Sequence, residues 1–145
     1  MYFVDREHIE RMLKYLENSL AMVKSQNAWT TNIEKRALER LVHMMIESMV
    51  DIGNAMIDGF IMRDPGSFED IIVILEDERV ITSKRATGLK RVIELRKVLV
   101  QQYLDVDHST LIDIIKKEEE HLQAFPDEVR TYLEDELGPV SAFRN

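Results

Sequence analysis

A polar stretch near residue 100 carries the residue types best suited to chemistry on an anion. Residues 96–107 read Arg-Lys-Val-Leu-Val-Gln-Gln-Tyr-Leu-Asp-Val-Asp. On a helix, Arg96 and Tyr103 are seven residues apart and share a face. Together with the amides of Gln101 and Gln102, this guanidinium and phenol are suited to binding a phosphate or a nucleotide. Residue spacing alone favours the alternative, which is an ordinary solvated polar face of a helix.

Two Asp/Glu-x-x-His pairs suggest a metal site, but their surroundings do not support one. Glu118 and His121 have the spacing used by di-iron carboxylate bundles, and Asp5 and His8 have the same spacing. Such a site needs two facing motifs and two further inward carboxylates. Glu118 lies in a run of charged residues, and Asp5 lies where a helix begins. We therefore expect no metal.

A second histidine pair and the absence of known motifs limit the chemistry further. His43 and Glu47 are one helical turn apart, which favours a partly buried, hydrogen-bonded histidine. The chain has no Cys, so disulfides, thiol catalysis and Cys-ligated zinc or iron–sulfur clusters are excluded. It contains no P-loop, G-x-G-x-x-G or G-x-S-x-G motif. We predict no cofactor.

The composition indicates a globular helical protein. Of the 145 residues, 45% are hydrophobic and 32% are charged, and five Gly and three Pro are too few for the turns of an all-β domain. We predict one helical-bundle domain over residues 1–145. No apolar run approaches the roughly 18 residues of a membrane span, and the N-terminus has no apolar signal core. We therefore expect a cytoplasmic protein with no membrane partner.

The charge is unevenly distributed along the chain. The net charge of −8 disfavours strong non-specific binding of nucleic acid. Residues 107–145 hold 10 acidic and 4 basic groups, whereas residues 84–97 hold six basic groups and one acidic group. The basic segment is either a local phosphate-binding patch or a solvated helix face.

Apolar spacing and capping signals predict an all-α, up-and-down antiparallel four-helix bundle with one or two additional helices. Thr31 with Glu34, Ser67 with Asp70, and Thr82 or Ser83 are the expected N-terminal caps. The expected helices cover about 5–25, 32–59, 68–78, 84–104 and 109–124, followed by a short one that begins or bends at Pro126 and ends near Gly138. From about residue 109 onward this helical segment is acidic.

The helix over 32–59 has more apolar positions than one buried stripe requires, so it is either central in the bundle or shared with a second copy. We predict a homodimer with a helical, Met-rich interface that includes Met45 and Met49. Gly53, inside this helix, is expected to let another helix approach closely.

Three segments carry a resemblance to a known family: Asp51-Ile-Gly-Asn-Ala-Met-Ile-Asp-Gly-Phe60, Arg63-Asp-Pro-Gly-Ser67 and Arg96 through Tyr103. Over about residues 4–108 the chain resembles the HepT-like branch of the HEPN superfamily. The resemblance implies a five-helix bundle around an antiparallel four-helix core, usually homodimeric. It also implies a minimal nucleotidyltransferase as partner. In some pairs the HEPN protein is a toxin with metal-independent ribonuclease activity, which the partner silences by transferring AMP to a tyrosine.

The family's catalytic pattern is Arg, four residues, His, one residue, Tyr. Here Arg96 and Tyr103 match, but Gln101 stands at the histidine position. Glutamine has no useful pKa for moving the 2′-hydroxyl proton in RNA cleavage. His108, beyond the expected helix end, either reaches back toward Arg96 or has a helix-capping or solvated role.

The resemblance therefore implies a non-catalytic or weakly active homodimer that binds a nucleotide, an RNA or a nucleotidyltransferase. Its cleft would contain Arg96, Gln101 and Tyr103, and Tyr103 would be the AMP acceptor. Further cleft residues would be Asp51, Asn54, Lys97 and Gln102. The alternative is an active metal-independent toxin ribonuclease of a toxin–antitoxin pair.

Overall fold

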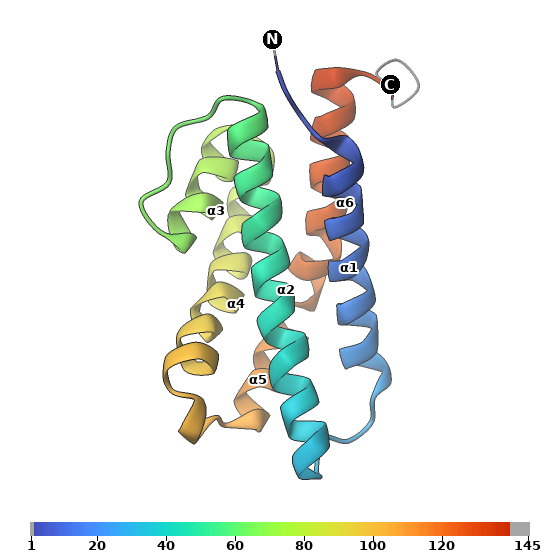
Figure 1. The fold of residues 1–145 in the computed structure, drawn as a ribbon, viewed down its shortest axis with the longest axis vertical. Helices are drawn as coiled ribbons and strands as arrows, with labels where there is room; N and C mark the ends of the chain where they lie inside the picture. The colour runs from blue at the N-terminus through green and yellow to red at the C-terminus, as the bar shows by residue number, and fades with distance from the viewer. Residues whose placement is uncertain (1, 140–145) are drawn as a thin grey trace.

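The computed structural model describes residues 2–139, and all regular structure within that range is helical. Residues 140–145, at the end of the predicted domain, lie outside it. The elements are α1 (Arg6–Ser25), α2 (Asn32–Gly59), α3 (Phe68–Asp77), α4 (Ser83–Gln101), the 3-10 helix η1 (Tyr103–Asp105), α5 (His108–Lys117) and α6 (Glu119–Leu137), as Figure 1 shows.

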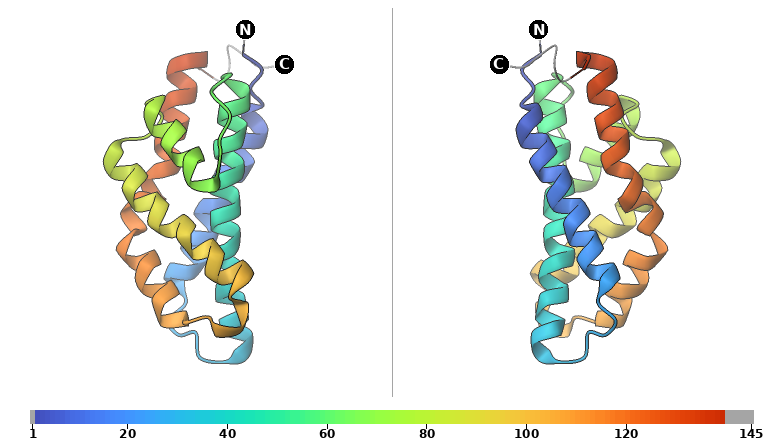
Figure 2. Two further views of the ribbon diagram at one scale, coloured as in Figure 1. Left: turned by 90° about the vertical axis from the view of Figure 1, so that its left-hand side faces the viewer. Right: turned by 90° about the vertical axis from the view of Figure 1, so that its right-hand side faces the viewer.

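The helices form the predicted antiparallel bundle. Four long helices, α1, α2, α4 and α6, alternate in direction and run along the long axis of the molecule (Figure 1). The short α3 packs against α2 and α4 at one end, and α5 packs against α2, α4 and α6 at the other (Figure 2). The prediction of a four-helix core with additional helices is confirmed.

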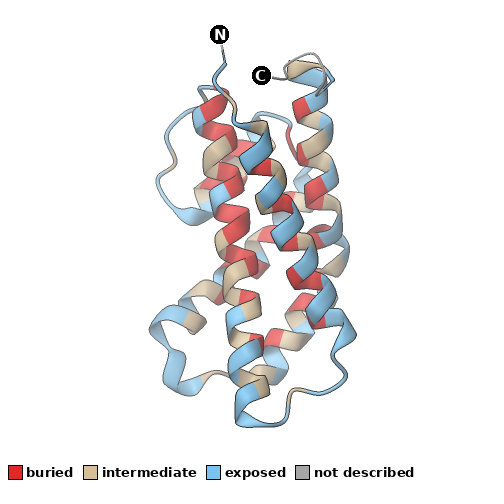
Figure 3. Cartoon of the chain, turned by 45° about the vertical axis from the view of Figure 1, so that its right-hand side comes forward, coloured by how far each residue is buried: buried red, intermediate tan, exposed pale blue. Residues whose placement is uncertain are grey.

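Helix α2 is the central element of the bundle. It packs against α1, α3, α4 and α5, and many of its residues are buried (Figure 3). Met45 and Met49 are both 0% exposed. The large number of apolar side chains on α2 is therefore explained by contacts within this chain. The expectation that Met45 and Met49 lie at a dimer interface is wrong, because neither can be reached from outside.

A glycine on α2 allows α3 to lie close to it. A Cβ atom added at Gly53 would lie 2.3 Å from the Cγ2 atom of Ile71 on α3. Only a residue without a side chain permits this approach. The predicted close contact at Gly53 is confirmed, and α3 is the helix that makes it.

The predicted N-terminal caps are present. Thr31 and Glu34 form a reciprocal capping box at the start of α2. The hydroxyl of Ser67 accepts a hydrogen bond from the backbone of Asp70, and Thr82 caps α4. These contacts satisfy backbone N–H groups that have no partner inside the helix, and they depend only on neighbouring residues.

The helix boundaries after residue 100 differ from the prediction. Helix α4 ends at Gln101 rather than near 104, and Leu104, which was counted toward its apolar face, is 83% exposed. The helix expected over 109–124 is broken at Glu118, whose buried carboxylate pairs with Arg91 of α4 at 2.9 Å. Pro126 lies inside the 19-residue α6 and neither begins nor ends it.

Candidate functional site

Arg96 of α4 is the centre of a surface cluster built from three helices. Its Nε atom donates a hydrogen bond to Oε1 of Glu47 on α2 at 2.6 Å. Its guanidinium carbon lies 4.3 Å from the centre of the Phe68 ring, at the start of α3. A cation over an aromatic face is stabilised by the ring quadrupole. The Arg96 side chain is 28% exposed, so it is fixed in place and still reachable from solvent.

The loop before α3 fixes the position of Phe68. Arg63 donates two hydrogen bonds to the carboxylate of Asp70, at 2.8 and 2.9 Å, and the Gly66 amide donates a third at 2.8 Å. These bonds favour the ionised carboxylate and lower the pKa of Asp70 to about 2. Together with the cap at Ser67, they set where α3 begins and hence where Phe68 meets Arg96.

His43 completes the group that we call the Arg96 cluster: Arg96, Glu47, His43 and Phe68. The Nε2 atom of His43 lies 3.4 Å from the same Glu47 oxygen that Arg96 contacts. The His43 side chain is 29% exposed, and that of Glu47 is 25% exposed. The sequence placed His43 and Glu47 on one face, but only the packing of α2 against α4 brings Arg96 to them.

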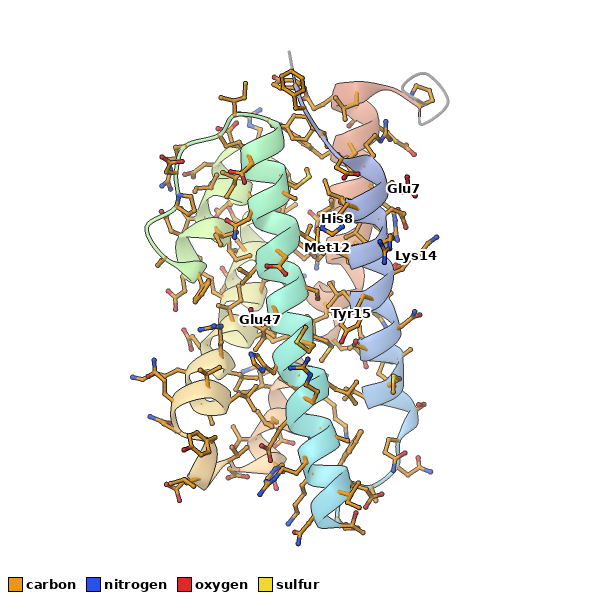
Figure 4. The ribbon with its side chains drawn as sticks, viewed as in Figure 1. Glu7, His8, Met12, Lys14, Tyr15 and Glu47 are labelled. Atoms are coloured by element: carbon orange, nitrogen blue, oxygen red, sulfur yellow. The ribbon has the colours of Figure 1, made fainter. Side chains whose placement is uncertain are left out.

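Asp51 lies one turn beyond Glu47 on α2. Partial burial and the negative charge of Glu47 raise its pKa, while His8 of α1 acts in the opposite direction. Asn54 follows on the next turn and is half-buried. Figure 4 labels Glu47 on α2, with His8 and Met12 on the neighbouring α1. Thus Asp51 lies one turn from Glu47 of the cluster and influences it as an acidic neighbour.

Three further polar residues lie at the end of α4 or immediately after it. Lys97, Gln101 and Gln102 are all exposed. The backbone amide of Gln102 donates to the carbonyl groups of Lys97 and Val98, which closes the last turn. Gln101, at the family's histidine position, is therefore the last residue of the helix and is surrounded by solvent.

Tyr103 lies on a different element from Arg96. It begins η1 and is 61% exposed, as the sequence led us to expect. It borders a cavity of about 460 Å³, whose lining is formed by Arg36, Glu39, Tyr103, Leu104, Val106 and His108. The helical face that Tyr103 was predicted to share with Arg96 does not exist, because α4 ends before it.

His108 turns toward the start of α2. Its Nε2 atom lies 2.8 Å from Oε2 of Glu39, and its side chain is 17% exposed. His108 is also the first residue of α5, whose N-terminal cap is Asp107. The structure therefore contradicts the alternative in which His108 reaches back to Arg96, because His108 contacts Glu39 instead.

The positive charge of segment 84–97 is partly offset by acidic side chains of α6 and by Glu118, which immediately precedes that helix. Lys84 faces Glu120, and Arg91 pairs with Glu118. Arg85 forms a second mixed group, the Arg85 cluster, with Glu128 and His121: its Nε donates to Glu128 and its Nη1 to Nδ1 of His121. A continuous phosphate-binding stripe along α4 is therefore absent from the described part of the chain.

The two residues considered first as metal ligands are engaged with arginines. Glu118 is 2% exposed and pairs with Arg91, and His121 is 9% exposed and accepts from Arg85. Residues 2–139 contain no group of three or more histidine or acidic side chains arranged to hold a metal ion. Both side chains act instead in holding α4 against α6.

Glu47 and Phe68 are the site residues that sequence reasoning missed. Glu47 was noted only as the neighbour of His43, and Phe68 only as an apolar residue of the third helix. No local signal identifies them, because their contacts with Arg96 join residues 49 and 28 positions apart. Phe68 is 40% exposed, and one face of its ring contacts the guanidinium of Arg96.

Comparison with known proteins identifies the family of this chain. The family described as "Ribonuclease HepT-like" matches residues 6–129. The chain belongs to the HepT-like family. It is 54% identical to "Putative RNase YutE" of Bacillus subtilis (strain 168), over 99% of this chain and all of that one. The solved structure of YutE, described as a cytosolic protein of unknown function, superposes with a TM-score of 0.94 and the same coverage.

More distant structures share the fold of this HepT-like chain. A toxin–antitoxin complex with AMP-PNP has a TM-score of 0.76 at 16% identity, covering 85% of this chain and 97% of the other. The tri-AMPylated Shewanella oneidensis HEPN toxin, in complex with MNT antitoxin, has a TM-score of 0.75 at 16% identity, covering 85% and 96%. Within residues 2–139, no helix has the length and apolar character needed to cross a membrane.

Proposed function

We propose that this HepT-like protein is a cytoplasmic homodimer that binds RNA or a nucleotide at the Arg96 cluster and pairs with a minimal nucleotidyltransferase. We infer that it cleaves RNA weakly or not at all by the family's route. The observation that carries the proposal is Gln101, an exposed amide at the position of the family's histidine. An amide can orient a phosphate, but it cannot take up or release a proton near neutral pH.

The geometry of Arg96 supports binding of a phosphate. Glu47 holds the Nε atom, and no hydrogen bond from the two terminal nitrogens is formed among the described residues. Those nitrogens are the ones that bind a phosphate in a bidentate manner. Phe68 supports the guanidinium from one face. Arg96 is therefore oriented in advance, which lowers the entropic cost of binding.

The homodimer is supported by apolar side chains exposed on the outside of the bundle. On α1, Tyr15 is 47% and Met22 is 56% exposed. At the end of α4 and in η1, Val100 is 40% and Leu104 is 83% exposed. Light scattering at tens of micromolar should give twice the chain mass of 17.0 kDa. A monomer at that concentration would contradict the dimer.

The nucleotidyltransferase partner is supported by the exposure of Tyr103 and by the cavity beside it. Among the distant relatives, a HEPN toxin is described as tri-AMPylated and bound to MNT antitoxin. On co-expression with a minimal nucleotidyltransferase, intact mass should show AMP adducts on this chain, and peptide mapping should place them at Tyr103. Equal modification of the Tyr103→Phe variant would contradict the assignment.

RNA binding is tested by the fluorescence anisotropy of labelled single-stranded and hairpin RNA. Arg96→Ala should weaken binding about tenfold, because one charge-assisted contact is lost. Lys14→Ala, which removes a positive charge from an exposed position of α1, is the matched control and should change affinity little. Equal losses in both variants would indicate non-specific attraction, and the proposed site would then be wrong.

The second candidate is an active metal-independent ribonuclease. The Gln101→His variant restores the family pattern, so it should gain cleavage if the rest of that site is intact. The presence of a histidine inside the Arg96 cluster is the observation that favours this candidate, and it leads to the following inference.

A further inference from the structure

We propose that His43 performs the proton transfer that Gln101 cannot, so that the protein cleaves RNA slowly and without metal through His43, Glu47 and Arg96. This inference rests on the proposed binding of RNA at Arg96. It assigns the catalytic base to α2 rather than to α4, where the family's pattern has it.

The placement of the three side chains supports this role. His43 and Arg96 both contact Oε1 of Glu47, at 3.4 and 2.6 Å, so the imidazole and the guanidinium lie on either side of one carboxylate oxygen. All three side chains are between 25% and 29% exposed. A substrate held by Arg96 is therefore next to a histidine that solvent and substrate can reach.

Glu47 acts as a positioning residue for both partners. When Nε2 of His43, which lies 3.4 Å from Oε1 of Glu47, carries the ring proton, Nδ1 keeps its lone pair and can accept a proton. Nδ1 forms no hydrogen bond with any described residue. The carboxylate also stabilises the imidazolium that forms, as in other carboxylate–histidine pairs. At the same time it fixes the orientation of Arg96.

The chemical step needs no oxidant, metal or further reactant. His43 takes the proton of the ribose 2′-hydroxyl as the 2′-oxygen attacks the adjacent phosphorus. The bond between 2′-oxygen and phosphorus forms, and the bond from phosphorus to the 5′-oxygen breaks. The imidazolium then returns the proton, through water, to the departing 5′-oxygen. The products are a 2′,3′-cyclic phosphate and a 5′-hydroxyl, and Arg96 stabilises the phosphorane between them.

The other three histidines do not have this arrangement. His108 pairs with Glu39, one turn before His43 on α2, and His121 is 9% exposed within the Arg85 cluster. His8 lies on α1, where its charge affects Asp51. Only His43 shares a carboxylate oxygen with Arg96 in the described structure.

The role of His43 as a base predicts how cleavage should depend on pH. Glu47 of α2, and Arg96 of α4, which contacts the same carboxylate oxygen as His43 does, are the charged groups beside His43. Because a neutral imidazole is the base, the cleavage rate should rise with pH and then level off.

The test compares the full-length wild-type protein with His43→Gln on an end-labelled single-stranded RNA, in EDTA, at excess protein. We expect slow wild-type cleavage with cyclic-phosphate ends, and about 100-fold slower cleavage by His43→Gln, the usual contribution of a general base. His8→Gln is the matched control, because it removes a histidine from an exposed position of α1. It should cleave as the wild type does.

Two further measurements make the result decisive. His43→Gln should bind RNA within about twofold of wild type, which shows that it is folded, and any residual cleavage should lose the rise with pH. Arg96→Ala, purified identically, should not cleave, which excludes a contaminating ribonuclease.

Cleavage by His43→Gln at the wild-type rate would overturn the inference. Tight RNA binding without wild-type cleavage would also overturn it and would leave the proposed binding function standing. Absence of RNA binding would overturn both.

Discussion

Helix α4 carries two clusters that each combine an arginine, a glutamate and a histidine, and they differ in what covers them. Near the start of the helix, Arg85 contacts Glu128 and His121, and near its end, Arg96 contacts Glu47, which His43 also contacts. The Arg85 side chain is 15% exposed, whereas that of Arg96 is 28% exposed. Helix α6 covers the first cluster, and the second faces solvent beside Phe68.

The hydrogen bonds follow this difference in exposure. The Nε atom of Arg85 donates to Glu128 and its Nη1 atom donates to His121, so two of its three nitrogen atoms already form hydrogen bonds within the protein. Arg96 uses only Nε within the described chain. The same three residue types therefore hold helices together in one place and present a guanidinium and an imidazole to solvent in the other. Residue type alone does not separate a structural cluster from a binding site.

The largest expected effect is on the packing of the Arg85 cluster. A Cβ atom at Gly88 would lie 2.1 Å from the His121 ring, so Gly88→Ala should lower the free energy of unfolding by about 2–3 kcal/mol through overpacking. Denaturant unfolding measures this value. Gly66→Ala is the matched control, because the nearest atom to its new Cβ is 3.7 Å away. Equal losses in the two variants would show that α4 and α6 are less tightly packed than described.

The comparison is sharpened by removing each arginine in turn. Arg85→Ala should cost about 1–2 kcal/mol of stability, because it leaves the partly buried Glu128 unpaired, and it should leave RNA affinity unchanged. Arg96→Ala should cost less than about 1 kcal/mol and should weaken RNA binding about tenfold. Thermal melting and anisotropy on the same samples test both. The reverse pattern would assign binding to the Arg85 cluster.

The smallest effect concerns the acidic neighbour of the Arg96 cluster. The pKa of Asp51 is raised in the folded protein, mainly by burial and by Glu47, so its ionised form is less favourable there than in the unfolded chain. This penalty is present at neutral pH, and it disappears as the pH falls through the raised pKa to the ordinary value. Asp51→Asn should therefore stabilise the protein at pH 7 by a few tenths of a kcal/mol, allowing for solvent screening.

For Asp51→Asn, unfolding curves across pH provide the check. The difference between variant and wild type should shrink below about pH 4, where the carboxyl group is protonated in both folded and unfolded chains. A stabilisation that persists at low pH would have another cause. If the variant were instead destabilised at pH 7, Asp51 would be making a favourable contact that its raised pKa does not reflect.

Helix locations could be predicted because their signals are local. The caps at Thr31, Ser67 and Thr82 involve side chains and amides within three residues of one another. The end of α4 was predicted wrongly because the helix was extended by apolar spacing to Leu104, which is 83% exposed, so burial gives no reason to extend it that far. Pro126 was predicted to begin or bend a short last helix, and it is instead buried inside the long α6.

The sequence by itself determined the helical class of this protein and most of its helices, which follow from residue types, short-range periodicity and nearby caps. The resemblance to the HepT-like family, also carried by the sequence, implied that Gln101 stands at the position of a catalytic histidine. The tertiary structure alone decided which arginine faces solvent and which histidine lies beside it. The contact between Arg96 and Glu47 spans 49 residues, and that between Arg85 and Glu128 spans 43. Such contacts depend on how α2, α4 and α6 pack, because exposure and hydrogen-bond saturation are set by neighbouring helices rather than by neighbouring residues.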